Sequence, residues 1–508
     1  MAASAQDTVV ETDIPSRLDR LPWSRWHWMI VLALGITWVL DGIEVTIVGA
    51  VSAVLQRKDT LGLSSSQIGE IAAAYVAGAV IGALFFGYLT DKLGRKKLFI
   101  ITLAWYTVFT VLTAFSWDFL SFAAFRVLTG IGIGGEYAAI NSAIDELIPA
   151  RRRGVTDLSI NSSYWLGAMI ASALSLVLLD PKLVPPQWGW RVAFFLGAVL
   201  AAAVIVVRRL VPESPRWLLT HGRHKEAEET VRAIEDHVRR SLGTDQLPVA
   251  EGEPISVDQS HTTHFGDIVR TLLREYPRRT FVAVTLMVTQ AFLYNAVFFT
   301  LAITLTTFFH VAQGSVGLYI LPFAAGNMVG PWVLGPLFDS IGRRAMIAGT
   351  YIISGLLLIV TGVLFLNGML NATTITIAWS VTFFFGSAGA SAAYLTGSEI
   401  FPMETRAMAI AVIYAFGTLA GGISGPLLFG RLIESHDPHA LFEGYLIGAA
   451  LMIVGGLVEA VLGVDAERKP LELIARPLSA VRQRLELAGV RQPRPAPATS
   501  DVGTGATR

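Results

Sequence analysis

Residues 87–97 read GYLTDKLGRKK, and a related string, GPLFDSIGRRA, returns at residues 335–345. Each copy follows one long apolar run and precedes another. A second pattern, Glu-x-x-Pro-x-x-x-Arg, also occurs twice, at residues 146–153 and 399–406. In both cases the copies lie about half the chain apart. Two halves with the same landmarks in the same order predict a duplicated membrane fold, and many secondary transporters build their site between two such halves.

The composition favours a membrane protein. Hydrophobic residues make up 53% of the chain and charged residues 15%, whereas about 25% is typical of soluble domains. The mean hydropathy is +0.56. The formal net charge is zero, so nothing indicates a nucleic-acid partner. The chain has no Cys, which excludes disulfides, thiol catalysis and Cys-based metal sites.

Twelve apolar stretches approach the ~20 residues that a helix needs to span hydrocarbon. They cover residues 27–55, 68–90, 97–116, 118–145, 155–179, 190–211, 279–309, 313–339, 344–368, 373–399, 406–430 and 441–464. The predicted fold class is therefore all-α, with twelve transmembrane helices in two pseudo-symmetric six-helix bundles.

The charged residues divide the chain further. We expect residues 1–26 to be a cytoplasmic segment, 27–211 and 279–464 to be the two bundles, and 212–278 to be a cytoplasmic linker with its own helices. Within the linker, residues 221–240 mix Glu and Arg at helical spacing and predict a surface helix. The tail, residues 465–508, is predicted to be largely disordered.

Lys and Arg in the short loops predict the orientation. Residues 95–97, 151–153 and 343–344 are basic and fall on one side, whereas the opposite loops hold Arg57, Lys58 and Lys182. The first side should be cytoplasmic, and both termini with it. The N-terminal segment carries acids and no apolar core, so we do not expect it to be a cleaved signal peptide. We expect a multi-pass protein of a cell membrane, namely a bacterial inner membrane.

Four strings in order resemble the major facilitator superfamily, in its branch of sugar porters and metabolite–proton symporters. They are GYLTDKLGRKK, RVLTGIGIGGEYAAINSAIDELIPARRRG (126–154), PESPRWLL (212–219) and SEIFPMETR (398–406). The resemblance covers about residues 25–465. It implies a carrier that works by alternating access, acts as a monomer in the lipid bilayer and needs no cofactor.

Both repeated motifs predict a latch at the cytoplasmic face. A charge network that forms in only one conformation would bias the equilibrium between inward-facing and outward-facing states. The alternative is a set of loops that merely follows the positive-inside rule. The predicted latch residues are Asp91, Arg95, Glu146, Arg153, Asp339, Arg343, Glu399 and Arg406.

Two acids lie deep in the first stretch. Asp41 and Glu44 are three residues apart and share a helix face, where burial and mutual repulsion favour the protonated form of at least one. Arg126, in the fourth stretch, lies at a compatible depth. We hypothesise that an anionic substrate competes with Asp41 for Arg126, and that protonation of Asp41 releases the Arg. The alternative is a pair held silent by a fixed partner. Glu136, further along the fourth stretch, is either a second proton site or a packing partner.

Resemblance supports this coupling site. In relatives, an acid in the first span and an Arg in the fourth couple protons to substrate. The string Asp41-Gly-Ile-Glu44 is similar to the Asp-Gly-x-Asp of aromatic-acid–proton symporters, with Glu in place of the final Asp.

The seventh span bears on the substrate. Sugar porters carry Gln-Gln-x-x-Gly-x-Asn there, and this chain keeps the second Gln and the Asn but neither the first Gln nor the Gly. Hydroxyl recognition needs several directional hydrogen bonds, so these losses weaken a sugar site. The same positions would equally line a pocket for an aromatic or other small organic acid. The predicted substrate-binding residues are Trp38, Arg126, Asn161, Gln290, Tyr294, Asn295 and Tyr394.

The sequence thus predicts a proton-coupled symporter that takes up a small organic acid. A sugar or polyol symporter is the first alternative, and a transporter-like solute receptor is the second. No G-x-x-x-x-G-K-[ST] string for ATP occurs, and no nucleophile–base or metal spacing stands out, so we expect neither an enzyme nor a metal site.

Overall fold

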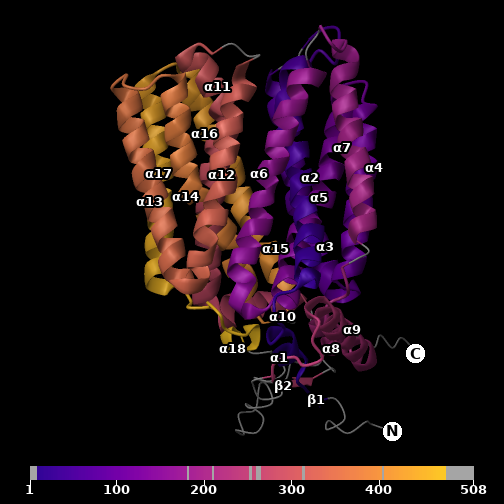
Figure 1. The fold of residues 1–508 in the computed structure, drawn as a ribbon. Coiled ribbons are helices and arrows are strands. Elements are labelled where there is room, and N and C mark those ends of the chain that lie inside the picture. Colours follow the sequence, from indigo (N-terminus) through magenta and orange to yellow (C-terminus); the bar gives the residue numbers. More distant parts are fainter. Residues whose placement is uncertain are drawn as a thin grey trace, which may run out of the picture.

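Long helices side by side form most of the molecule, with a smaller assembly at one end (Figure 1). The computed structural model describes residues 9–475, apart from 56, 64, 180–181, 209–210, 251–254, 259–264, 312–314 and 403–404. The predictions for residues 1–8 and for the tail from 476 onwards lie outside the described residues.

Six helices of the first half follow the six predicted stretches to within about four residues. They are α2 (Arg25–Leu55), α3 (Ser65–Leu93), α4 (Arg95–Ala114), α5 (Phe119–Leu147), α6 (Arg153–Leu178) and α7 (Pro186–Arg208), with the short η1 (Ala150–Arg152) before α6.

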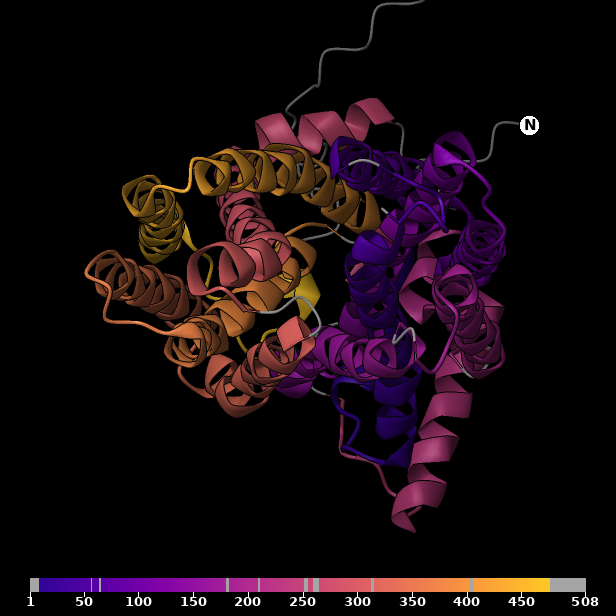
Figure 2. The same cartoon turned by 90° about the horizontal axis from the view of Figure 1, so that it is seen from above.

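The second half repeats the pattern, and its eleventh predicted stretch is divided in three by a π-helical turn. Its elements are α11 (Pro277–Phe309), α12 (Val316–Ser340), α13 (Arg343–Leu366), α14 (Ala372–Glu399), α15 (Arg406–Gly417), η4 (Thr418–Gly422), α16 (Ile423–Glu434) and α17 (Pro438–Leu462). Seen from above, the helices of the two halves gather on opposite sides (Figure 2).

The lengths and compositions of these helices suit a membrane. Among the described residues, eleven candidate spans are long and apolar enough to cross one. The helix α7 adds 23 residues with Arg191 and Arg208 as its only charges, which also suffices to span hydrocarbon. The all-helical, twelve-span fold predicted from the sequence is confirmed.

Packing follows the duplication as well. In the first half α3 packs on α5, α2 on α6 and α4 on α7. Their counterparts in the second half also pair, α12 with α14, α11 with α16 and α13 with α17. The halves meet through α6 with α12 and α3 with α15, which are again counterparts.

Glycines permit the closest of these contacts. A Cβ added to Gly134 on α5 would lie 1.9 Å from the carbonyl oxygen of Ala79 on α3. A Cβ at Gly82 on α3 would lie 2.0 Å from the carbonyl oxygen of Ile131. Small residues that bring backbones together are typical of helix pairs in lipid. The glycine spacing after Arg126 therefore serves helix packing.

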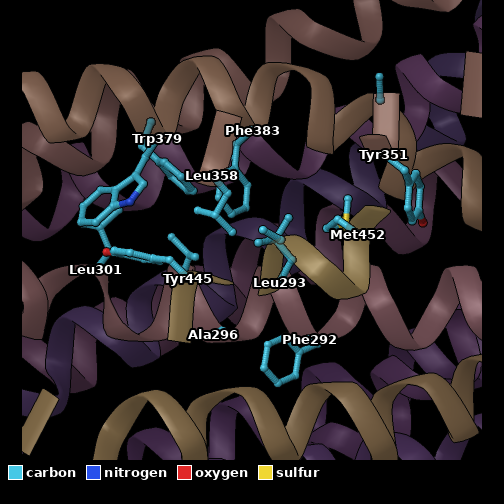
Figure 3. Close-up of a cluster of buried hydrophobic side chains, with 14 of the residues drawn as sticks. Phe292, Leu293, Ala296, Leu301, Tyr351, Leu358, Trp379, Phe383, Tyr445 and Met452 are labelled. Atoms are coloured by element: carbon cyan, nitrogen blue, oxygen red, sulfur yellow. The ribbon is translucent and has the colours of Figure 1, made fainter. Parts of the chain in front are cut away.

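Apolar side chains fill the interior of each half and also cover its outside. In the second half, buried residues from α11, α13, α14 and α17 interlock, among them Phe292, Trp379 and Tyr445 (Figure 3). On the outer surface Leu120 is 72% and Val461 64% exposed. Lipid tails, unlike water, impose no penalty on such a surface, which explains the high overall hydrophobicity.

The assembly at one end contains both copies of each repeated motif, and we call it the motif end. It includes α8 (Pro215–Thr220), α9 (His224–Leu242), α10 (Phe265–Arg270) and the π-helical η2 (Thr271–Glu275) from the linker, the N-terminal α1 (Ile14–Asp19), and α18 (Leu471–Ile474). The helix α9 coincides with the predicted surface helix.

One element of the motif end was not predicted. The strand β1 (Val9–Thr12) pairs antiparallel with β2 (Ile255–Asp258), with Val9 opposite Asp258. Each strand has only four residues and the two are far apart in sequence, so no local sequence pattern predicts their pairing. Among the described residues they form the only sheet.

Candidate functional site

Three ionisable side chains lie buried between the helices of the first half. Asp41 is 1% exposed, Glu44 2% and Arg126 1%. Asp41 and Glu44 lie on α2, and Arg126 lies on α5. Charged groups in a membrane interior are costly and face the bundle or a cavity, where they usually serve function. Their burial makes these three residues the first candidates for a functional site.

The acid that binds Arg126 differs from the one predicted. Arg126 Nη1 donates a hydrogen bond to Glu44 Oε1, and the two groups form an ion pair. The sequence hypothesis gave this role to Asp41. The two acids share a helix face, but Glu44 has one more methylene and lies about one turn further along α2, so its carboxylate meets the guanidinium. In the described structure, Glu44 is the carboxylate paired with Arg126.

Aromatic rings surround the Arg126 guanidinium. Its Cζ atom lies 4.6 Å from the centroid of the Tyr75 ring and 5.7 Å from that of Phe194. A guanidinium over an aromatic face gains cation–π attraction while it stays desolvated. Beside it is a small cavity of about 30 Å³, lined by Val45, Val48, Ile71, Ala72, Tyr75, Val76 and Arg126. That volume exceeds what one water molecule needs.

Atoms of this ion pair keep unused hydrogen-bonding capacity. Arg126 Nε and Glu44 Oε2 are buried without a hydrogen-bond partner among the described residues. An unsatisfied buried donor or acceptor is costly, so its persistence points to a ligand, water or second conformation that satisfies it.

Gly42, inside the Asp-Gly-Ile-Glu string, has a packing role. A Cβ at Gly42 would lie 1.9 Å from the carbonyl oxygen of Tyr164 on α6. Gly167 on α6 has the same relation to Val39 on α2. The close approach of α2 and α6 therefore fixes the helix that carries both acids.

Aromatic side chains from the two halves meet near this level. Trp38 on α2 and Tyr394 on α14 are in edge contact, with ring centroids 6.0 Å apart. Trp165 on α6 and Tyr294 on α11 are 5.8 Å apart. Tyr294 also donates a hydrogen bond of 2.8 Å to Asn327 Oδ1. Three of the predicted binding residues, Trp38, Tyr294 and Tyr394, thus take part in aromatic contacts between the halves, in two separate pairs.

The predicted amides lie differently. Asn161 Nδ2 donates to the carbonyl oxygen of Asp157, and Asn295 Nδ2 donates to that of Ala291, each within its own helix. Gln290 Nε2 points to the sulfur of Met287 at 3.0 Å. Asn161 Oδ1 remains a buried acceptor without a partner among the described residues. Only part of the amide set is therefore available to a polyhydroxylated ligand.

Several residues of this region were missed by the sequence reasoning. Tyr75, Trp165 and Asn327 line or support it, and Asn327 is fully buried. The rule that singled out Asp41, namely polar groups inside apolar runs, would also have found Asn327. Trp165 and Tyr75 carry no such signal, because aromatic residues are common throughout membrane helices. Glu136 is buried on α5, about 15 Å along the helix from Arg126.

A second group of buried charges lies at the motif end. Arg95 pairs with Glu146 at 3.0 Å within the first half. Arg343 pairs with Glu399 at 3.0 Å and with Asp339 at 2.6 Å within the second half. The matching pairs agree with the duplication of both motifs. The side chain of Asp91 lies outside the described residues.

Other ion pairs of this group cross between the halves. Arg153 Nη1 lies 3.4 Å from Glu399 Oε1, and Arg406 Nη1 lies 3.8 Å from Glu146 Oε1. Asp339 also accepts hydrogen bonds from the backbone N–H groups of Gly154 and Val155, at 3.2 and 2.9 Å. In this conformation the halves are joined at the motif end by charges contributed reciprocally.

Comparison with known proteins identifies the family. Residues 25–476 match the family described as "Sugar (and other) transporter". The chain belongs to this family. This sugar-transporter-family protein, with its many apolar helices, is therefore a multi-pass membrane transporter and no enzyme, as the sequence predicted.

Individual relatives agree with the assignment. The niacin transporter NiaP of Acinetobacter baylyi is 27% identical over 469 residues, which cover 91% of this chain and 99% of NiaP. The inner membrane metabolite transport protein YgcS of Escherichia coli is 24% identical, over 90% of this chain and 96% of YgcS. Among solved structures, the proton:xylose symporter XylE bound to a bromo-deoxyglucose superposes with a TM-score of 0.70 at 17% identity, over 89% of this chain and 98% of XylE. At this identity the likeness to XylE concerns the fold.

Proposed function

We propose that this transporter takes up a small organic acid together with protons. The observation that carries the proposal is the buried Arg126–Glu44 ion pair, whose Arg126 Nε and Glu44 Oε2 atoms have no partner among the described residues. An arginine in this setting is suited to a carboxylate, because its fork of donors matches the two carboxylate oxygens.

Coupling follows from competition for Arg126. The ionised Glu44 carboxylate binds the Arg126 guanidinium. Once Glu44 takes up a proton, it releases Arg126. The substrate carboxylate then replaces Glu44 as the anion on Arg126, so the proton and the anion are bound together. Asp41, one turn towards the motif end, is placed to pass the proton onward. Glu44 therefore takes the role that the sequence hypothesis gave to Asp41, namely that of the acid that competes with the substrate for Arg126.

Two groups of aromatic rings favour an aromatic acid. Tyr75 and Phe194 flank the Arg126 guanidinium, and two separate ring pairs, Trp38 with Tyr394 and Trp165 with Tyr294, lie at the contact between the halves. Flat ligands gain from such edge and face contacts. Niacin, the substrate named for the relative NiaP, is a pyridine carboxylate and combines the two required groups.

The transport cycle would alternate between states closed at either end. The cross-half pairs of Arg153 with Glu399 and Arg406 with Glu146 would hold the motif end closed, as the latch predicted from the sequence. Basic residues gather at the motif end, for example Arg151 and Arg344, and the positive-inside rule places this end in the cytoplasm. Both termini would then be cytoplasmic, in a monomer of a bacterial inner membrane.

A test uses proteoliposomes that enclose a pH dye. Niacin and benzoate should acidify the interior, and xylose should not. Glu44→Gln should abolish acidification but retain exchange of labelled niacin, because a permanently neutral side chain leaves Arg126 open and carries no proton. Glu443→Gln, at an exposed position on α17, is the matched control. Acidification that persists unchanged in Glu44→Gln would refute the coupling role.

A sugar is the second candidate. It is favoured by the fold shared with XylE, the retained Gln290 and Asn295, and the free acceptor Asn161 Oδ1. Acidification driven by xylose or another sugar, with no response to aromatic acids, would replace the first proposal with this one. Binding of a solute without any flux would instead indicate a receptor.

A further inference from the structure

A short helical segment crosses the motif end just before the first spanning helix of the second half. It consists of α10 and η2, residues 265–275, and only Tyr276 separates it from α11. The segment runs transversely to the long helices (Figures 1 and 2). Because the candidate span of α11 begins at Pro277, the segment lies near the level where lipid headgroups meet the acyl chains.

One face of this segment packs on the protein. Thr271 and Leu272 are buried. Leu272 belongs to an apolar cluster with Phe401, just after α14, and Met408 on α15. These contacts fix the rotation of the segment about its own axis, and so they decide which of its residues point outward.

The outward surface combines an apolar strip with a basic strip. The apolar strip is Val269 and Leu273, one turn apart and 39% and 65% exposed. The basic strip is Arg270 and Arg274, which follow them by one position each and are also exposed. Phe281, near the start of α11, is 55% exposed, so apolar exposure continues from the segment into the spanning helix. This is the pattern of an amphipathic helix that lies in a membrane interface.

The basic strip has spare positive charge. Residues 265–279 contain four Arg against two acids, Asp267 and Glu275. Arg270 pairs with Glu275 at 3.5 Å, but both side chains are exposed, and exposed pairs of this kind contribute little. Arg274 forms no ion pair or hydrogen bond with another described residue.

The two later Arg have structural partners instead. Arg278 Nη2 donates to the carbonyl oxygen of Val461 at 3.1 Å, and Arg279 Nη1 donates to that of Ile400 at 2.8 Å. These bonds join the start of α11 to the ends of α17 and α14. Of the four Arg, the two in the basic strip are therefore available to a ligand outside the chain.

We propose that residues 265–275 bind anionic phospholipids of the leaflet at the motif end. The apolar strip inserts among the acyl chains next to the headgroups, where its exposed area leaves water. The basic strip binds the phosphate groups, because a guanidinium matches two phosphate oxygens and anionic lipids attract basic side chains at the membrane surface. Long Arg side chains reach from an apolar surface into the headgroups. The proposal concerns the outside of the molecule and does not depend on which solute is carried.

The first measurement locates the apolar strip. The chain has no native Cys, so Leu273→Cys can carry a single spin label. In nanodiscs of phosphatidylcholine and phosphatidylglycerol in equal parts, this label should collide more often with oxygen, which concentrates in the bilayer, than with a water-soluble nickel chelate. Leu242→Cys, at an exposed Leu on α9, is the matched control and should collide more often with the chelate. A label at position 273 that behaves like the one at position 242 would overturn the proposal.

The second measurement tests the basic strip. Native mass spectrometry of the full chain in detergent, with phosphatidylglycerol added, gives the apparent affinity for that lipid. Arg270→Gln combined with Arg274→Gln should weaken this affinity about tenfold or more. Arg232→Gln combined with Arg240→Gln, at exposed positions on α9, removes the same charge and should leave the affinity unchanged.

A soluble competitor separates a lipid from a free phosphate. Glycerol 1-phosphate carries the same phosphate group without acyl chains, so it should not displace phosphatidylglycerol. Displacement by this compound would identify a site for soluble phosphates and overturn the proposal. An equal loss of lipid affinity in both double variants would also overturn it, because it would show a general attraction to positive charge with no site at residues 265–275.

Discussion

Arg153 of α6 and Glu399 of α14 belong to opposite halves of the chain, and 3.4 Å separates Nη1 of the first from Oε1 of the second. Each is one end of a repeated Glu-x-x-Pro-x-x-x-Arg motif, so the motif of one half binds the motif of the other. The duplicated sequence thus supplies its own complementary partner.

Glu399→Gln should favour parting of the halves at the motif end. The substitution leaves Arg153 without its cross-half anion, at a cost on the order of 3–5 kcal/mol to the closed state. The chain has no native Cys, so spin labels at Lys97→Cys on α4 and Ser340→Cys on α12, both exposed and on opposite halves, should report a larger fraction of molecules with the halves parted. Because Glu399 also binds Arg343, a double-mutant cycle with Arg153→Gln isolates the cross-half term. Additive effects in that cycle would show that the contact does not stabilise the closed state.

Arg126→Lys should abolish uptake of aromatic acids while the protein stays folded. Lysine keeps the charge but loses the planar fork that faces Glu44 and stacks between Tyr75 and Phe194. We expect the affinity for niacin in detergent, measured by calorimetry, to fall at least about tenfold, equivalent to about 1.4 kcal/mol. Arg431→Lys, at an exposed position on α16, is the control. Undiminished niacin binding in Arg126→Lys would remove Arg126 from the substrate site.

Gly42→Ala should destabilise the protein. The added methyl group would meet the Tyr164 carbonyl oxygen at 1.9 Å, and overpacking of this kind costs about 1–3 kcal/mol. Gly49→Ala is a control on the same helix, because nothing lies within 4 Å of the added Cβ there. Thermal unfolding in detergent should show a lower midpoint for the first variant and an equal or higher one for the second. Equal midpoints for both variants would mean that α2 and α6 do not approach as described.

Docking of the N-terminal segment, residues 9–21, on α9 should weaken in acid. Burial raises the pKa of Glu235, but hydrogen bonds and charges from Arg17 and Arg20 outweigh burial and hold the pKa below its ordinary value. A carboxylate of this kind stabilises docking above its unfolded pKa of about 4.5, and the contribution is lost as the pH falls through the folded pKa. A spin label at Ser16→Cys should therefore be immobile at pH 7 and mobile in stronger acid.

Glu235→Gln tests the same contact at neutral pH. Without the carboxylate, the label at position 16 should be mobile even at pH 7. Glu226→Gln, on the exposed side of α9, should behave like the unmodified protein. An immobile label in Glu235→Gln would show that the burial of Ile14 and Leu18 and the β1–β2 pairing suffice to dock the segment.

The sequence by itself determined the spans, the duplication and the types of charge at each end. These are local properties, since a run of ~20 apolar residues or a motif such as Glu-x-x-Pro-x-x-x-Arg is complete within one segment. It also indicated that Asp41, Glu44 and Arg126 belong together, because helix rise converts residue number into depth. The helix limits and the fold class followed from these signals alone.

Only the tertiary structure decided which groups meet. Glu44 rather than Asp41 reaches Arg126, Asn161 and Asn295 donate to their own helices, and Arg153 lies between Glu399 and Asp19. Each of these outcomes depends on how one helix is rotated and shifted against another, or on the pairing of β1 with β2 across most of the first half of the chain. A single sequence fixes depth within a helix, whereas helix rotation emerges from the packing of many side chains at once.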